Sequence, residues 1–472
     1  TGNQRQDWLN SKYIIMWGWN PSEMRDGTNS EYILKEARKK GARVVCIDPR
    51  MTLSAVAHAD EWIPIRPGTD VAMMSAMAYV MITEGLYDKD FVQRFCSGFN
   101  RGQMPAGHED EESYEDYILG ARDGQPKTPE WAERITTVPR DVIARITREY
   151  ATAEAAVLYQ GYGMQRRAYG EQVVRAGCVL AAMTGNVGKP GGWASGIALQ
   201  AGGGPFWNIF PVLENPVKAQ IPTFLWTEAI LRGPELGAKD GLVGIDRLPH
   251  GIKMMWAVAS NAIVNQHANV NRTVGIISDT SMLEFFVVQD QFLTPTAQFA
   301  DLVLPACTQF ETWGLEDGWK YGEELILQPQ ILDPPWETKS DYAICAAVAE
   351  KLGIGQEFTQ GRDEKQWVGA LLDEYRKLRF PELPSLETFE KKNLGVYSRP
   401  VEKPSVAFRK FRQDPEKHPL KTPSGKIEIF SQALHERQLP DEVPAVPKYI
   451  QEWDSPFGSD SEGYPLRVSG TH

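Results

Sequence analysis

The hydrophobic pattern at the start of the 472-residue chain predicts a strand–helix–strand unit. The apolar run YIIMW over 13–17 ends at a glycine and is typical of a buried parallel strand. A helical pattern over 28–40 follows, and a second β-branched run over 43–47 ends at Asp48. Such units cross over right-handedly and bind ligands beyond the carboxyl ends of their strands, so we expect Asn20 and Asp48 to face one crevice.

The pattern then predicts an alanine- and methionine-rich helix over 70–83 and a further strand over 156–159. Between them, the charged segment 103–127 with its glycines and prolines is typical of an excursion on the surface. After another helix, eight of the twenty residues over 185–204 are glycine. So many glycines exclude a regular element and predict a long loop, which is often functional.

A second copy of the first unit begins near Met254, and four spacings match between the copies. Asn20 to Asp48 is 28 positions, and Asn261 to Asp290 is 29. The other three agree to the residue: Asp48 to Thr52 with Asp290 to Thr294, Asp60 to Pro64 with Asp301 to Pro305, and Asp60 to Asp70 with Asp301 to Glu311. Four matches in order, each at a predicted strand end, indicate duplication. The sequence therefore predicts two tandem, doubly wound α/β domains over 1–245 and 246–445, followed by a linker over 446–472.

Composition and charge exclude several classes of protein and kinds of metal site. With 50 basic and 62 acidic residues the formal charge is −12, which argues against a nucleic-acid binder. No apolar stretch is long enough for a membrane helix, and the five cysteines form no C-x-x-C pair that would indicate zinc, an iron–sulfur cluster or a disulfide framework. The chain starts without Met and stops inside a strand-like pattern over 464–472, so we expect it to be the middle of a longer protein.

Carboxylates at the strand ends form a candidate nucleotide site. Asp48, Asp70 and Asp290 could each accept two hydrogen bonds from a guanine edge, or bind ribose hydroxyls. Backbone amides over 18–20 and 161–163 could approach phosphates, because glycine permits close contact. The alternative is that these aspartates only cap turns and helices. The turn after the first strand reads GWNP rather than G-x-G-x-x-G, which disfavours an NAD-dependent dehydrogenase.

Other candidate residues are open to two interpretations each. Arg166 and Arg167 would clamp a diphosphate or form a solvated surface pair. His267 would be a ligand or proton donor, or a structural group. Three aromatic residues of the glycine-rich region would line a ligand entrance or pack as core: Trp193, Phe206 and Trp207. No Ser-His-Asp order, H-E-x-x-H or P-loop is present, so the residues indicate a two-lobed nucleotide-like binder without an identifiable nucleophile.

Six motifs resemble the molybdopterin oxidoreductases of the dimethyl sulfoxide reductase family. They are WGWNPSEMR over 17–25, IDPRMT over 47–52, WIPIRPGTD over 62–70, GNVG over 185–188, ADLVLP over 300–305 and TPSGKIE over 422–428. The similarity runs over nearly the whole chain. Within the family, the segments AILRGPE over 229–235 and NQH over 265–267 are most similar to the catalytic subunit of membrane-attached anaerobic dimethyl sulfoxide reductases.

The resemblance implies two molybdopterin guanine dinucleotides that hold one molybdenum, spread across two pseudo-twofold-related domains of a four-domain enzyme. Carried over by motif, one dinucleotide would be served by Trp17, Gly18, Asn20, Asp48, Arg50, Asp70, Gly161 and Gln165, and the other by Asn261, Gln289, Asp290 and Asp341. In the family, a domain with a 4Fe-4S cluster and the molybdenum ligand precede this region, and a barrel domain follows it. We therefore assign no metal ligand and no catalytic residue, and expect residues 1–472 alone not to retain the cofactor.

The resemblance also implies an activity, partners and a location. The expected reaction is reductive oxygen-atom transfer from an S-oxide or N-oxide in anaerobic respiration. Electrons would come from an iron–sulfur subunit and a membrane anchor subunit at the periplasmic face of a bacterial inner membrane, with no direct membrane span in this chain. Two alternatives remain: an oxidoreductase for selenate, tetrathionate, polysulfide or formate, or a scaffold without cofactor like the large subunit of respiratory NADH dehydrogenases. The presence of both strand-end aspartate sets argues against the scaffold.

Overall fold

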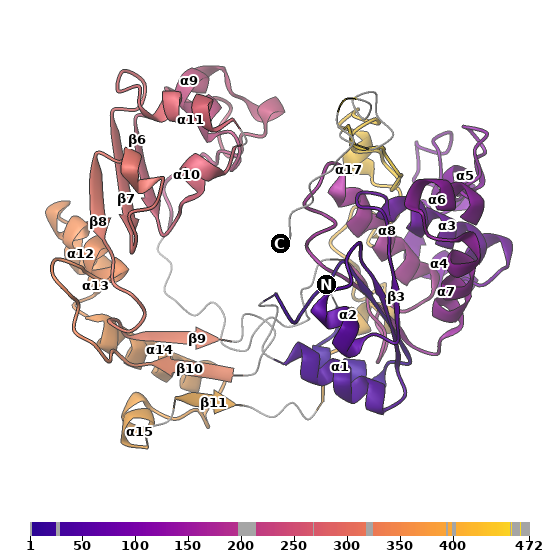
Figure 1. Cartoon of the computed structure of the whole chain (residues 1–472), viewed down its shortest axis with the longest axis horizontal. Helices are drawn as coiled ribbons and strands as arrows, with labels where there is room; N and C mark the ends of the chain where they lie inside the picture. The colour runs from indigo at the N-terminus through magenta and orange to yellow at the C-terminus, as the bar shows by residue number, and fades with distance from the viewer. Residues whose placement is uncertain are drawn as a thin grey trace. The chain divides into compact units, whose positions relative to one another are not determined.

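The computed structural model describes residues 2–24, 29–196, 214–267, 269–317, 324–392, 395–398, 403–453, 455 and 463. These residues form two compact units (Figure 1). Unit 1 lies within Thr1–Trp207 and Arg399–His472, and unit 2 within Asn208–Asp317 and Glu324–Ser398. Each unit is described by itself.

This division differs from the predicted domain boundaries 1–245, 246–445 and 446–472. The segment before residue 245 contributes helix α9 (Trp226–Arg232), whose Ile230 packs in the core of unit 2. The chain after residue 403 returns to unit 1, where strand β12 (Ile427–Glu428) pairs in parallel with β4 (Cys96–Ser97). The predicted linker also packs there, with Val446 only 2% exposed. Two-residue strands leave no hydrophobic period, so the return could not be predicted from the pattern.

Unit 1 is built on a four-stranded parallel sheet in the order β3-β2-β1-β5. Its further elements lie before, between and after these strands. The bounds are β1 (Tyr13–Trp17), α1 (Ser30–Lys39), β2 (Arg43–Ile47), α2 (Leu53–His58), β3 (Glu61–Ile63), α3 (Asp70–Thr83), α4 (Lys89–Phe95), α5 (Tyr114–Leu119), α6 (Pro129–Thr136), α7 (Arg140–Thr152), β5 (Ala156–Gln160), α8 (Gly170–Met183), α16 (Arg409–Gln413) and α17 (Gln432–His435).

Both faces of this sheet are covered, as a continuous apolar strand requires. Ile15 of β1 lies between Val45 of β2 and Leu158 of β5, in the core beneath α3, α7 and α8. The neighbouring row, which contains Ile14, belongs to a second core with α1 (Figure 1). Helix α3 is buried on nearly every side and packs against α6, α7 and α8, so the position of its first residue, Asp70, is fixed.

The strand predictions at 13–17 and 43–47 and the helix prediction at 70–83 are confirmed to the residue. The prediction of a surface excursion over 103–127 is wrong, because this segment contains α5 and Tyr114 is fully buried in the main core. Trp193 is 1% exposed and packs on Tyr159, so it belongs to the core rather than to a ligand entrance. Phe206 and Trp207 lie outside the described residues.

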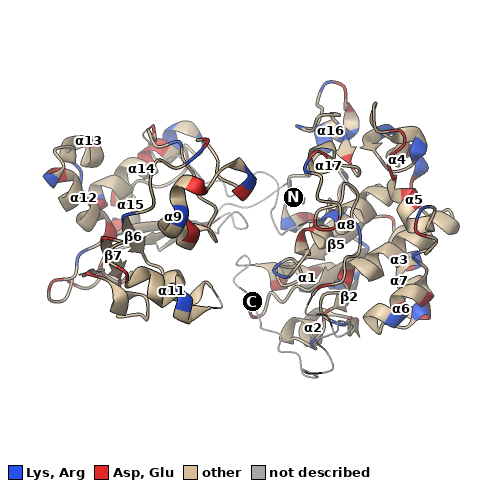
Figure 2. Ribbon diagram, turned by 90° about the horizontal axis from the view of Figure 1, so that it is seen from above, with Lys and Arg blue, Asp and Glu red and all other residues tan. Residues whose placement is uncertain are grey.

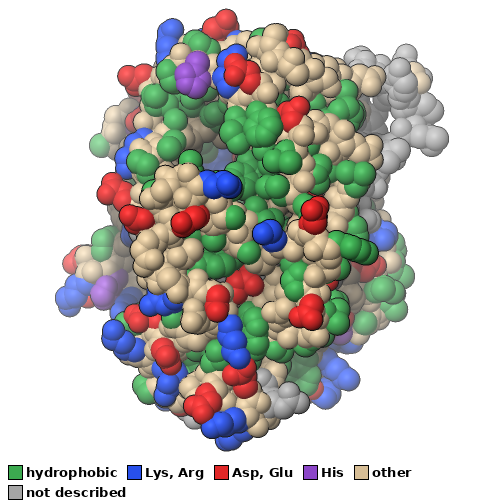
Figure 3. All heavy atoms as spheres, turned by 90° about the vertical axis from the view of Figure 1, so that its left-hand side faces the viewer, with side chains coloured by type: hydrophobic (Ala, Val, Ile, Leu, Met, Phe, Trp, Pro, Cys, Tyr) green, Lys and Arg blue, Asp and Glu red, His purple; other side chains and the backbone are tan. Residues whose placement is uncertain are grey.

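Unit 2 contains a three-stranded parallel sheet in the order β6-β7-β8 and an antiparallel sheet in the order β11-β10-β9. One face of the parallel sheet packs on α9 and α11, whereas Met254 and Trp256 on its other face are 53% and 37% exposed. Figure 3 shows apolar side chains gathered across the middle of one face of this unit. The bounds are β6 (Met254–Val258), α10 (Ala262–Asn265), α11 (Val270–Ile277), β7 (Phe285–Asp290), β8 (Leu302–Pro305), β9 (Gly314–Asp317), β10 (Glu324–Gln328), α12 (Asp341–Lys351), α13 (Gly355–Thr359), α14 (Glu364–Leu378), α15 (Leu386–Lys391) and β11 (Val396–Ser398).

The sequence repeat is visible in the hydrogen bonds of the two parallel sheets. The carboxylate of Asp60 accepts from the backbone N–H of Val44 at 2.8 Å, and that of Asp301 accepts from Phe286 at 2.7 Å. Likewise, Thr52 and Thr294 accept from the N–H three residues on, at 3.1 and 3.2 Å. Equivalent residues thus make equivalent bonds, which supports duplication of the first unit.

Acidic and basic residues are interspersed along the helices of both units (Figure 2). None of the helices in the described part of the chain is both long enough and apolar enough to cross a membrane.

A substitution at Gly98 tests how the returning segment, the chain after residue 403, is attached to unit 1. Its φ is +79°, and a Cβ there would lie 2.5 Å from the backbone nitrogen of Phe430. We expect Gly98→Ala to lower the stability of the full-length protein by about 3 kcal/mol or more, since the left-handed backbone alone costs ~1–2 kcal/mol and the contact adds to it. The readout is the urea midpoint of unfolding.

The matched control is Gly107→Ala, whose φ is +82° but whose added Cβ meets nothing within 4 Å. It should lower the midpoint by the backbone contribution only. Equal shifts for the two variants would show that the contact with Phe430 does not matter.

Candidate functional site

The predicted residues of unit 1 meet at the carboxyl edge of its parallel sheet. The N–H of Gly18 donates to the carbonyl of Ile47 at 2.8 Å, and the N–H of Gly161 donates to that of Trp17 at 2.9 Å. A Cβ on Gly161 would lie 1.9 Å from the Gly18 carbonyl oxygen. The chain therefore leaves β1 and β5 with the two backbones in contact, which only glycine at 161 allows.

Asn20 and Asp48 lie at the same edge, as predicted. The carboxamide oxygen of Asn20 accepts from the Ser54 hydroxyl at 2.6 Å, which links the end of β1 to the start of α2. Asp48 follows β2; its carboxylate accepts from the N–H of Arg50 at 2.9 Å, and its carbonyl accepts from the indole of Trp62 at 2.9 Å. Burial raises the pKa of Asp48.

Asp70 is the most enclosed of these carboxylates, with 5% of its surface exposed. It begins α3, and its Oδ1 accepts from the indole N–H of Trp17 at 2.8 Å. Burial raises the pKa of Asp70 to about 6, although the indole and the positive charge of Arg167 both favour the ionised form.

The arginine residues behave differently from one another. Arg167 makes a two-pronged ion pair with the buried carboxylate of Glu452, at 2.8 and 2.6 Å. Arg166 instead lies over the ring of Tyr162, with its guanidinium carbon 5.6 Å from the centroid. Arg50 pairs with Glu23 at 2.9 Å. The two adjacent arginines therefore have separate partners in this structure and do not form a joint clamp. Gln165 is half-buried in the loop that follows β5.

Unit 2 places its four predicted residues around the carboxyl end of β7 and the helices beside it. The carboxamide oxygen of Asn261 accepts from the N–H of Thr296 at 3.0 Å, as Asn20 accepts from Ser54. Asp290 ends β7, and its carboxylate accepts from a backbone N–H two residues on at 3.2 Å.

Gln289 and Asp341 form a pair at this edge. Gln289 is fully buried, and its Nε2 donates to Oδ1 of Asp341 at 2.6 Å. Its Oε1 is also buried and accepts no hydrogen bond from any described residue. A buried acceptor without a donor is costly, so this oxygen is suited to a ligand N–H or O–H.

Glu311 occupies the repeat position of Asp70, but its carboxylate has a different kind of partner. Its carboxylate turns back to accept the N–H of Thr308 at 2.7 Å. The carboxylate at the strand edge of unit 2 comes instead from Asp341, at the start of α12.

Four contributing residues were not predicted from the sequence. Ser54 and Thr296 anchor the two asparagines. They follow these asparagines by 34 and 35 positions, so the sequence repeat carries a signal for both. Trp62 lies inside a motif that was recognised. Glu452 is 285 residues from Arg167, and no local pattern signals that pair.

His267 packs within unit 2. One ring nitrogen lies 3.0 Å from the carbonyl of Phe224, and the ring packs 5.4 Å from that of Trp226. Nothing in the described structure assigns it a substrate. Across the described ranges, no three His, Cys, Asp or Glu side chains are grouped so that they could hold a metal ion.

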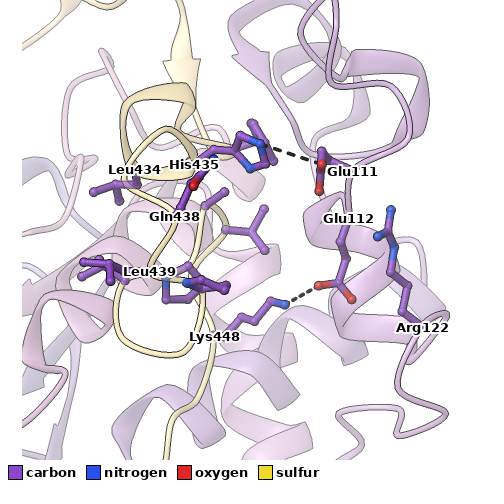
Figure 4. Close-up of a pocket in the computed structure, with 14 residues that line it drawn as sticks. Glu111, Glu112, Arg122, Leu434, His435, Gln438, Leu439 and Lys448 are labelled. Atoms are coloured by element: carbon purple, nitrogen blue, oxygen red, sulfur yellow. Dashed lines mark hydrogen bonds and ion pairs between the residues drawn. The ribbon is translucent and has the colours of Figure 1, made fainter.

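A cavity of about 490 Å³ in unit 1 lies apart from the predicted residues, none of which lines it. Glu111 faces His435 across it at 3.8 Å, and Glu112 forms an ion pair with Lys448 (Figure 4). These pairs join the loop before α5 to the segment that returns to unit 1.

Comparison with known proteins decides the family. The model of the family described as "Molybdopterin oxidoreductase" matches residues 1–351. The chain belongs to the molybdopterin oxidoreductase family. Membership implies a molybdenum–molybdopterin cofactor and confirms the resemblance seen in the motifs.

Relatives of this molybdopterin oxidoreductase include two reductases from other bacteria. Dimethyl sulfoxide reductase DmsA of Escherichia coli (strain K12) is 42% identical over the whole chain, which covers 59% of that protein. Dimethyl sulfoxide/trimethylamine N-oxide reductase of Rhodobacter capsulatus is 33% identical over 93% of the chain and 53% of its own length. The chain thus spans less than two thirds of the length of these relatives.

The fold is also found in a solved structure. Acetylene hydratase from Pelobacter acetylenicus superposes with a TM-score of 0.62 at 22% identity, over 97% of this chain and 61% of that one. The prediction of an α/β fold with parallel sheets is confirmed.

The raised pKa of Asp70 predicts how the stability of this oxidoreductase depends on pH. Its folded-state pKa of about 6 lies above the ordinary 3.8, so the folded protein binds more protons than the unfolded chain between these values. Stability is therefore lost as pH rises through 6, by about 3 kcal/mol from this residue. Asp70→Asn keeps an oxygen for Trp17 but cannot ionise.

We expect the variant to gain about 3 kcal/mol relative to the wild type between pH 4 and pH 7. The measurement is the urea midpoint of both full-length proteins at several pH values. A difference between the two proteins that does not change with pH would contradict the buried, weakly acidic Asp70.

Proposed function

We propose that the protein is the catalytic part of a molybdenum oxidoreductase that reduces S-oxides or N-oxides. The observation that carries the proposal is the duplicated strand edge, where each parallel sheet presents an anchored asparagine and a carboxylate paired with a strand-end side chain: Trp17 with Asp70, and Gln289 with Asp341. The names of relatives that are 39–42% identical over the full chain, all dimethyl sulfoxide reductases or chains so described, support the substrate class.

We propose the bis(molybdopterin guanine dinucleotide) form of the cofactor, because two similar edges fit two similar arms. The residues present suit such a ligand. The close contact between Gly18 and Gly161 holds the turns after β1 and β5 together at this edge, and the free Oε1 of Gln289 needs a donor such as a purine N–H. A guanine edge offers two parallel N–H groups, which a carboxylate such as Asp70 or Asp341 accepts.

In this proposal the chain binds and orients the cofactor. Asn20 and Asn261 hold the turns after β1 and β6, while Asp48 and Asp290 present oxygens beyond β2 and β7. Arg50 and Gln165 would lie along the first dinucleotide. When bound, the molybdenum cofactor supplies the two-electron redox chemistry. The protein supplies position and electrostatics.

We extend the proposal to the full-length enzyme on the basis of the family. A 4Fe-4S cluster outside this chain would deliver electrons from an iron–sulfur subunit and a membrane anchor, with the enzyme at the periplasmic face of a bacterial inner membrane. The relatives' names support reduction of S-oxides and N-oxides over the alternatives of selenate, tetrathionate, polysulfide or formate chemistry and of a cofactor-free scaffold.

Cofactor content tests the site. The full-length native protein should contain about one molybdenum and release two molecules of guanosine monophosphate, measured by elemental mass spectrometry and chromatography. We expect Asp70→Asn and Asp341→Asn each to lower the released nucleotide at least two-fold, because an amide cannot accept both guanine N–H groups.

The control is Asp373→Asn on α14, because the side chain of Asp373 is 69% exposed. This variant should leave the molybdenum content and the released nucleotide unchanged. Unchanged nucleotide in the two site variants would leave Asp70 and Asp341 as helix-start residues only.

Substrate class is tested separately by oxidation of a reduced viologen dye. The full-length enzyme should turn over dimethyl sulfoxide and trimethylamine N-oxide, and should be at least ten-fold slower with selenate or tetrathionate. Faster turnover of an oxyanion would assign the enzyme to another branch of the family.

A further inference from the structure

A cavity of about 460 Å³ in unit 2 is not used by the proposed function. It lies among α12, α13, α14 and the start of β9, and none of the residues predicted for the dinucleotides lines it. Figure 1 labels these four elements. Its volume is that of a site for a small organic molecule. Aromatic side chains dominate its lining: Trp313, Tyr342, Phe358 and Trp367.

These rings are held in place by one another. Tyr342 and Phe358 are stacked, with centroids 5.8 Å apart and planes 20° apart. The indole of Trp367 donates to the Tyr342 hydroxyl at 3.1 Å, and that hydroxyl donates to the carbonyl of Arg362 at 2.5 Å. The aromatic wall is therefore preorganised, which lowers the entropic cost of binding.

The same rings already attract cations. The guanidinium carbon of Arg362 lies 4.7 Å from the centroid of Trp367, and the ammonium of Lys365 lies 4.7 Å from that of Trp313. Both are within the range in which the electron-rich face of an indole attracts positive charge.

Two carboxylates, Glu357 and Glu364, also line the cavity. Neither forms an ion pair with a residue in the described ranges. Glu364 is half-buried, and its pKa is raised first by burial and also by the negative charge of Asp341. Of the two bases beside the rings, Lys365 pairs with Glu390 at 2.6 Å, and neither Lys365 nor Arg362 lines the cavity. The lining is therefore mainly apolar and aromatic, and its charged side chains are the two carboxylates.

We propose that this cavity binds a small organic ammonium ion, with its charge toward Glu364 and its alkyl groups against Trp313, Phe358 and Trp367. An organic anion would face two carboxylates, whereas an ammonium ion would pair with Glu364, whose half-buried carboxylate accepts hydrogen bonds from Ser340 and the backbone of Trp313 but has no basic partner among the described residues. The proposal does not depend on the proposed function, because it uses neither the cofactor nor the strand edges.

Choline and its neutral isostere 3,3-dimethyl-1-butanol separate charge from shape. Isothermal titration of each into the full-length protein should show choline binding at least about ten-fold more tightly. Glu364→Gln should weaken choline about ten-fold while leaving the isostere nearly unchanged. Trp313→Leu should weaken choline several-fold.

The matched control is Trp336→Leu, because Trp336 also belongs to unit 2 but is 96% exposed and does not line the cavity. It should bind choline like the wild type, and circular dichroism checks that every variant is folded. Equal binding of the two probes, no choline binding in the millimolar range, or choline binding unaffected by both cavity variants would each overturn the proposal.

Discussion

The contact between the backbones of Gly18 and Gly161 is the constraint on which the site of unit 1 depends. The Gly18 carbonyl oxygen occupies the space that a Cβ at position 161 would need, 1.9 Å away. Because β1 and β5 are neighbours in the sheet, this contact fixes how the chain leaves both strands. Trp17, the last residue of β1, then directs its indole to Asp70, whose position is fixed separately by the buried helix α3.

Duplication preserved the scaffold but not the chemistry of the two edges. The asparagine anchors and the aspartate–backbone bonds recur in both units, because they hold the strand ends together. The enclosed carboxylate does not recur at its repeat position, since Glu311 closes its own loop. Unit 2 brings Asp341 to the edge from another helix, and there its partner is Gln289. Two ligands of one kind can thus be met by different residues on related frameworks.

The sequence could predict those features that depend on residues close together along the chain. Continuous apolar strands and a helix buried on all sides have strong local patterns, so 13–17, 43–47 and 70–83 were predicted to the residue. The strand-end location of Asn20 and Asp48 followed from parallel topology. The domain boundary could not be predicted, because the returning segment is held by two-residue strands and by ion pairs between residues far apart in the sequence. The Trp17–Asp70 bond links residues 53 positions apart and leaves no pattern.

The returning segment also affects the pKa of a carboxyl group in the site. Arg167 lowers the pKa of Asp70, whereas Glu452, which binds Arg167 through both carboxylate oxygens, raises it. Their charges act on the pKa of Asp70 in opposite directions, and burial is the largest cause, so the carboxyl remains a weak acid. Without Glu452, the uncompensated guanidinium would favour ionised Asp70. The predicted linker is thus part of the surroundings that set the charge at the strand edge, and residues far apart in sequence jointly determine it.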